Sequence, residues 1–177
     1  MKKTVLSAVL VLMIAASLVS CKSKTNETAG APAESAAIAN PMVETDEAGF
    51  VEKTGISLKV PKGATNVKYF VIDNTLGEMR FTLDGMEFTA RAKSTAAFED
   101  ISGMYYTWDV EDDAKVDRCE AKCRRHIGSD KTIDVICWFD AAPGISYSLS
   151  TEGKDLDGFD IIAIAEQVFE PMQGEAG

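Results

Sequence analysis

Three cysteines and the only histidine of the chain lie near one another in sequence and are the residues best suited to chemistry. Cys119, Cys123, His126 and Cys137 offer four ligands of zinc type, although their spacing is not that of a familiar zinc finger. On an expected strand His126 faces away from the two nearby cysteines, so we predict no metal site. Cys119 and Cys123 are too far apart on an extended strand to bridge each other. We predict a Cys123–Cys137 disulfide, with Cys119–Cys137 as the alternative and free buried thiols as a third reading.

Basic residues alternate along the same stretch. Arg118, Lys122, Arg124 and His126 form a basic stripe in an otherwise acidic chain. Such a stripe is either a candidate surface for an anionic partner, for example an envelope polymer, or the solvated face of a sheet.

The acids before this stripe could hold calcium, and the many acids of the whole chain leave a carboxylate enzyme as a separate possibility. The acids before the stripe are Asp109, Glu111, Asp112, Asp113 and Asp117. A calcium loop would need a glycine at its sixth position, which this segment lacks, so a solvated acidic turn is the simpler interpretation. A hydrolase could work through carboxylates alone, but no pair stands out, and the sequence indicates no catalytic residue.

Cys21 carries a separate chemistry. It ends the stretch Leu18-Val19-Ser20-Cys21, which follows the charged start Met1-Lys2-Lys3 and an apolar run from Val5. Small Ser20 suits a signal peptidase, and the thiol of Cys21 can accept a diacylglycerol. The arrangement resembles the lipobox of bacterial lipoproteins. It predicts a signal peptide over residues 1–20, acyl chains such as palmitate on Cys21, and an anchor in the cell membrane with the protein facing the extracellular side.

Composition sets the remaining organisation. The chain has 18 basic and 28 acidic residues, and loss of residues 1–20 would remove two of the basic ones. A nucleic-acid partner is therefore not expected. Residues 21–40 lack aromatics and apolar periodicity, which predicts a lipidated, disordered tether. Residues 41–173 have the length of a single domain, and residues 174–177 form a short disordered tail.

One hairpin is the clearest structural signal. Apolar and polar residues alternate on both sides of Asp84-Gly85, a pair that favours a two-residue type I′ turn. This turn places Leu83 opposite Met86 and Phe81 opposite Phe88, with all the apolar side chains on one face.

Other segments extend this hairpin into a sheet. Strands are expected over 56–60, 67–73, 104–110, 116–126, 132–140 and 145–149, with a turn at 128–131. A short helix is expected from Thr45 to Gly55, and an amphipathic helix capped by Asp157 ends before Pro171. The predicted fold class is α+β, a curved antiparallel sheet built from hairpins with both helices packed on one face.

Parts of the second half resemble a known group of proteins. These are residues 100–104 (DISGM), Pro143-Gly144 leading into residues 147–150 (YSLS), and residues 162–169. They are similar to uncharacterised exported lipoproteins of Gram-positive bacteria, which contain domains of unknown function. The resemblance implies export and an α+β fold, and it carries over no functional residue.

These observations favour a binding or interaction module held at the cell envelope. No cofactor is indicated, and the expected partners are the membrane, through Cys21, and an envelope polymer or protein. The alternatives are a carboxylate-dependent hydrolase acting on envelope material and a sensory or structural domain that acts beside a protein partner.

Overall fold

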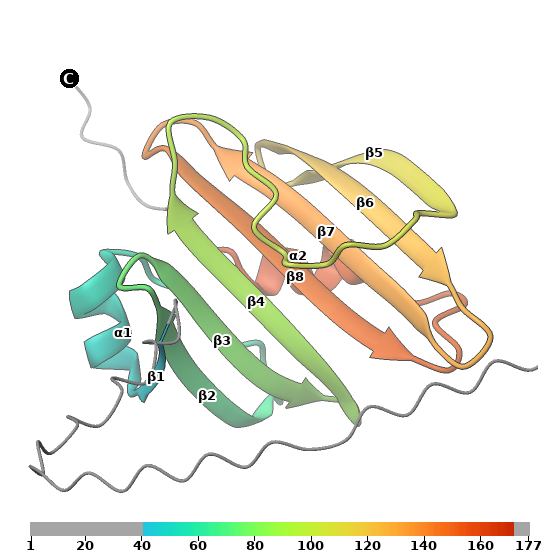
Figure 1. Ribbon diagram of the computed structural model, residues 1–177, viewed down its shortest axis with the longest axis horizontal. Helices are drawn as coiled ribbons and strands as arrows, with labels where there is room; N and C mark the ends of the chain where they lie inside the picture. Colours follow the sequence, from blue (N-terminus) through green and yellow to red (C-terminus); the bar gives the residue numbers. More distant parts are fainter. Residues whose placement is uncertain (1–40, 172–177) are drawn as a thin grey trace, which may run out of the picture. The chain divides into compact units, whose positions relative to one another are not determined.

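Within residues 41–171, which the computed structural model describes, eight strands form one open sheet (Figure 1). Every neighbouring pair of strands is antiparallel, and their order is β1-β2-β3-β4-β8-β7-β6-β5. The strands are β1 (Met42–Thr45), β2 (Thr65–Ile72), β3 (Leu76–Leu83), β4 (Met86–Ser94), β5 (Val110–Val116), β6 (Cys119–Ile127), β7 (Thr132–Asp140) and β8 (Ile145–Gly153). The predicted antiparallel sheet is confirmed.

The sheet is built from two four-stranded meanders. β1 to β4 are sequential neighbours, and so are β5 to β8, but β4 pairs with β8. Residues 95–109, which we call the connector, therefore carry the chain past β8, β7 and β6 to the far edge. In Figure 1 the connector crosses in front of β8 and β7, while α2 lies behind them. A strand predicted over 104–110 is wrong, because all of it except Val110 belongs to the connector.

The β3–β4 hairpin has the predicted register. Phe81 pairs with Phe88 and Leu83 with Met86 across the turn. Asp84 and Gly85 have φ angles of 51° and 81°, as a type I′ turn requires. The two phenyl rings stack with centroids 5.1 Å apart, and both side chains are buried.

Two helices contribute to one core with this hairpin. α1 (Glu47–Thr54) packs on β2 and β3, and its Phe50 lies against Tyr69 and over Gly77, where a side chain would collide with the ring. α2 (Ile161–Val168) packs on β5 and β7. Buried side chains of both helices belong to the same apolar cluster. No helix among the described residues is long and apolar enough to cross a bilayer.

The start of α2 differs from the prediction. Asp160, not Asp157, caps the helix, because its side chain accepts hydrogen bonds from the N–H groups of Ile162 and Ala163. Phe169 follows the helix and packs edge-on against Trp138 and Tyr147, which stack on each other.

Two further strand assignments need correction. Ile56 and Leu58 are buried as predicted, but Val60 is exposed, and the N–H of Lys59 bonds to the carbonyl of Val168 rather than to a strand. Conversely, the acidic segment that was expected to be a turn is β5, an almost fully exposed edge strand. Acids are disfavoured in strands, yet charge on an edge discourages pairing with other copies.

Removing either stacked ring from the hairpin should destabilise the domain. We expect Phe81→Ala or Phe88→Ala to lower the free energy of unfolding by about 3–5 kcal/mol, because each leaves a cavity in the core. The measurement is denaturant unfolding, with Phe98→Ala at an exposed position as the matched control. Equal midpoints for the hairpin variants and wild type would contradict the assignment of this face to the core.

Candidate functional site

The face of the sheet opposite the helices carries a row of polar residues along the pairing register. Glu78, Arg91, Ser148, Cys137 and Lys122 follow one another across β3, β4, β8, β7 and β6. The connector lies on this face, which we call the connector face. The connector therefore contacts several of the predicted functional residues on this face.

A buried carboxylate begins the row and helps to hold the connector in place. Glu78 is 0 % exposed, and its two oxygens accept hydrogen bonds from Arg80 at 2.6 Å and Arg91 at 2.7 Å. Arg91 also donates to the carbonyls of Ile101 at 3.2 Å and Ser102 at 2.7 Å. The guanidinium thus joins the sheet to the middle of the connector, since charged hydrogen bonds of this kind are strong.

Asp100 provides the second attachment of the connector. Its carboxylate accepts hydrogen bonds from the N–H and O–H of Ser102, and Arg124 of β6 donates to it at 2.6 Å. Burial by itself raises the pKa of Asp100, but the bonds from Ser102 and the charge of Arg124 outweigh it and hold the pKa below its usual value. The connector is therefore attached to both meanders.

The predicted disulfide is not formed, and the reason is strand parity. Cys137 lies opposite Lys122 on the connector face, whereas Cys123 lies opposite Ile136 on the helix-covered face, as does Cys119 opposite Val116. The turn between Ile127 and Thr132 has an even number of residues, so odd positions of β6 pair with even positions of β7. The sheet separates Cys137 from both candidate partners, and all three thiols are free.

The free thiols are held in unreactive surroundings. Burial raises the pKa of Cys119 and of Cys123 to about 11 each, and it raises the pKa of Cys137 further. The Cys137 thiol also points at the carboxylate of Asp100, with 3.6 Å between Sγ and Oδ1. These cysteines are structural residues of the core and its connector face.

The basic stripe lies where its alternation predicts, but its lysine and arginine side chains are paired with carboxylates. Lys122 bonds to Asp113 at 2.7 Å, and Arg124 bonds to Glu111 at 3.0 Å as well as to Asp100. His126 lies 3.3 Å from Asp109, and Arg118 bonds to Asp140 at 2.9 Å. An anionic polymer would have to displace these carboxylates.

The acidic residues of β5 do not converge on a metal. Asp112 faces the helix-covered side, while Glu111 and Asp113 face the connector side and bind β6. Within residues 41–171, no group of three or more histidine, cysteine or acidic side chains is placed to hold a metal ion.

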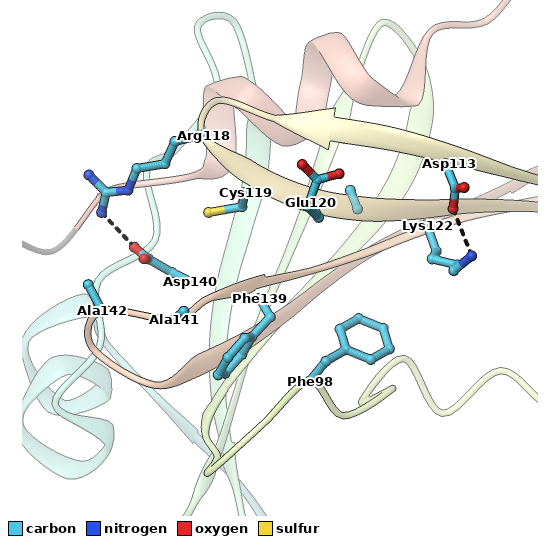
Figure 2. Close-up of a pocket in the computed structure, with 11 residues that line it drawn as sticks. Phe98, Asp113, Arg118, Cys119, Glu120, Lys122, Phe139, Asp140, Ala141 and Ala142 are labelled. Atoms are coloured by element: carbon cyan, nitrogen blue, oxygen red, sulfur yellow. Dashed lines mark hydrogen bonds and ion pairs between the residues drawn. The ribbon is translucent and has the colours of Figure 1, made fainter.

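A groove opens where β6 and β7 separate. β6 begins at Cys119 and β7 continues to Asp140, yet the two strands pair only from Ala121 opposite Trp138 onward. Figure 2 shows the two ribbons drawing apart toward Arg118 and Ala142. The groove has a volume of about 570 Å³, which lies in the range of small-molecule and peptide pockets.

The groove combines an apolar lining with charges. Its lining residues are Phe98 of the connector, Asp113 of β5, Arg118 of the β5–β6 turn, residues 119–122 of β6, Phe139 and Asp140 of β7, and the following Ala141 and Ala142. In Figure 2 the rings of Phe98 and Phe139 lie on one side and the carboxylate of Glu120 on the other. Because it brings apolar surface and several charged groups together, this groove is the candidate functional site.

Sequence reasoning found part of this site. Arg118 and Lys122 belong to the predicted basic stripe, but Phe98, Phe139 and Asp140 were not singled out. Asp140 could have been noticed as a polar residue at the end of a continuous apolar strand. Phe98 could not, because its place depends on the path of the connector across the sheet.

The thiols should be unreactive in the folded protein. In a Cys21→Ser chain, we expect iodoacetamide at pH 7.5 to leave the buried Cys119 and Cys137 unlabelled and to react only slowly with the half-buried Cys123, because burial raises the pKa of all three thiols and limits access to the first two. After denaturation without reductant all three should react, as counted by mass spectrometry. Only one labelled thiol after denaturation would reveal a disulfide and contradict the register.

The connector should weaken in acid. The lowered pKa of Asp100 means that its contribution to stability is complete above the pKa of an unfolded aspartate, about 4, and is lost as pH falls below it. Asp100→Asn should therefore be less stable than wild type at pH 7, with a gap that closes toward pH 2. Thermal unfolding across this range measures the gap, and Glu52→Gln on exposed α1 is the control. A constant gap would contradict the ionic role of Asp100.

Comparison with known proteins adds no relative to this picture. No protein-family model matches the chain, and no curated protein or solved structure does so.

Proposed function

We propose that this chain is a lipid-anchored binding module on the outer face of a bacterial cell membrane. The observation that carries the binding role is the groove between β6 and β7, which exposes apolar side chains of Phe98 and Phe139 beside charged groups. Concave, partly apolar surfaces of this kind are where proteins most often bind a ligand or a partner.

The address rests on Cys21 and the segment before it. The charged start, the apolar run and the lipobox residues Leu18 to Cys21 occur in the order that export and lipidation need. This segment lies outside the described residues, as do the whole tether 21–40 and the tail 174–177. The resemblance to exported lipoproteins of Gram-positive bacteria supports the same address.

In this proposal, residues 21–40 tether the domain to the membrane. A flexible chain of this length has an end-to-end distance of about 25 Å, so the α+β domain would stay close to the lipid surface. Acyl chains on Cys21 contribute about 0.8 kcal/mol per buried methylene, which makes two or more of them a stable anchor.

The hydrolase alternative gains no comparable support from the structure. No carboxylates were singled out for it, and Asp100, Glu111 and Asp113 bind basic side chains of β6. A sensory or structural domain that acts beside a partner remains compatible with the groove, because it too would need a docking surface.

Lipidation and binding can be tested in the same cells. We expect a labelled fatty acid to be incorporated into the wild-type protein and into Cys119→Ser, but not into Cys21→Ser. A photoreactive phenylalanine analogue placed at Phe98 should form an adduct with an envelope component in intact cells. The same analogue at Val60, which is equally exposed, is the matched control.

The lipid anchor and the binding groove are contradicted by different results. Wild-type protein without label would remove the lipid anchor. Adducts of equal yield at residues 60 and 98, or none at either, would remove the groove as the binding surface.

A further inference from the structure

The most exposed charged groups of the groove are two carboxylates. Asp113, Glu120 and Asp140 line it together with only two basic residues, Arg118 and Lys122. The side chains of Asp113 and Glu120 are 85 % and 78 % exposed, whereas those of both basic residues are about half exposed. Each of these two carboxylates pairs with a lysine of the chain, Asp113 with Lys122 at 2.7 Å and Glu120 with Lys115 at 2.9 Å, and exposed ion pairs of this kind are weak enough for a ligand to displace. The whole chain carries a net charge of −10, so its field also favours a positively charged ligand.

One end of the groove already holds a cation. The Asp140 side chain is 3 % exposed, and its Oδ2 accepts a hydrogen bond from the Arg118 guanidinium at 2.9 Å. Arg118 reaches this carboxylate from the tight turn after β5. A guanidinium group of the chain itself therefore shows how the groove accommodates a cation beside apolar surface.

The aromatic wall suits the stems of basic side chains. Phe98 is 44 % exposed, and Phe139 is half-buried beside it in the lining. Lysine and arginine lay their methylene groups on apolar surface while the charged end stays in water, and aromatic faces attract the charge.

The spacing of the two exposed acids indicates an extended chain. Asp113 lies opposite Lys122, and Glu120 is the next residue on the same face of β6, so the two acids are diagonal neighbours. Diagonal neighbours in a sheet are about 7 Å apart. Alternate side chains of an extended peptide have nearly the same separation, about 6.6 Å.

We propose that the groove binds an extended basic segment of a partner protein. Lysine or arginine residues at alternate positions place their stems on Phe98 and Phe139 and their charged ends at Glu120 and Asp113. This inference deepens the proposed binding role, but it concerns the purified chain and is tested independently of the lipid anchor.

The probe is a ten-residue fluorescent peptide in which lysine and serine alternate, titrated into the full-length protein and followed by fluorescence anisotropy. Glutamate replaces lysine in the control peptide, and spermidine is the small-molecule competitor.

We expect Phe98→Ser to weaken peptide binding about tenfold and Glu120→Gln about fivefold. Lys122→Gln should tighten it about threefold, because the substitution frees Asp113. Val60→Ser, far from these charges in sequence and equally exposed, should leave it unchanged.

Arg118→Gln gives a second readout. It should also tighten binding, because Asp140 loses its internal partner, and the peptide should raise the melting temperature of this variant more than that of wild type. If Arg118→Gln does not fold, Lys122→Gln still shows whether removal of a basic residue from the groove tightens or weakens peptide binding.

Three results would overturn the inference. The first is no binding of the lysine peptide, or equal binding of the glutamate peptide. The second is weaker binding by Lys122→Gln, which would show an anionic ligand. The third is displacement of the peptide by equimolar spermidine, which would show a site for small polyamines rather than for a protein segment.

Discussion

The ion pair between Glu78 and Arg91 is the interaction on which the connector face depends. A carboxylate that is fully buried is costly unless it is hydrogen-bonded, and two arginines bond to it here. Arg91 also donates through Nη1 to the carbonyls of Ile101 and Ser102. Arg91 thus balances the charge of the Glu78 carboxylate and also holds the connector, which forms no strand at this point.

Both faces of the central strands are consequently covered by different means. α1 and α2 seal one face with a continuous apolar core, whereas the connector covers the other with polar attachments and a small cluster around Val135 and Trp108. The connector brings Phe98 to the place where β6 and β7 stop pairing. The groove therefore arises from a strand separation at one end of the sheet and a connector that lines it without filling it.

Local patterns were enough for some of this structure. Phe81 and Phe88 could be placed because the Asp84-Gly85 turn fixes register and facing over a few residues. The disulfide prediction failed although the same reasoning was available: the even turn at 128–131 puts Cys123 and Cys137 on opposite faces. The strand predicted at residues 104–109 was wrong for another reason, because β-propensity cannot reveal that a segment crosses a sheet instead of joining it. Phe98 and Glu78 gain their roles only from contacts distant in sequence.

In our proposal, the groove is the surface through which the domain binds a partner. The most direct measurement is the change in backbone amide chemical shifts when the alternating lysine–serine peptide is added to ¹⁵N-labelled protein. The account predicts changes concentrated at Phe98, at residues 118–122 and at residues 139–142, with the helix-covered face unaffected. Changes spread evenly over the acidic surface, or concentrated at the opposite edge strand β1, would contradict it.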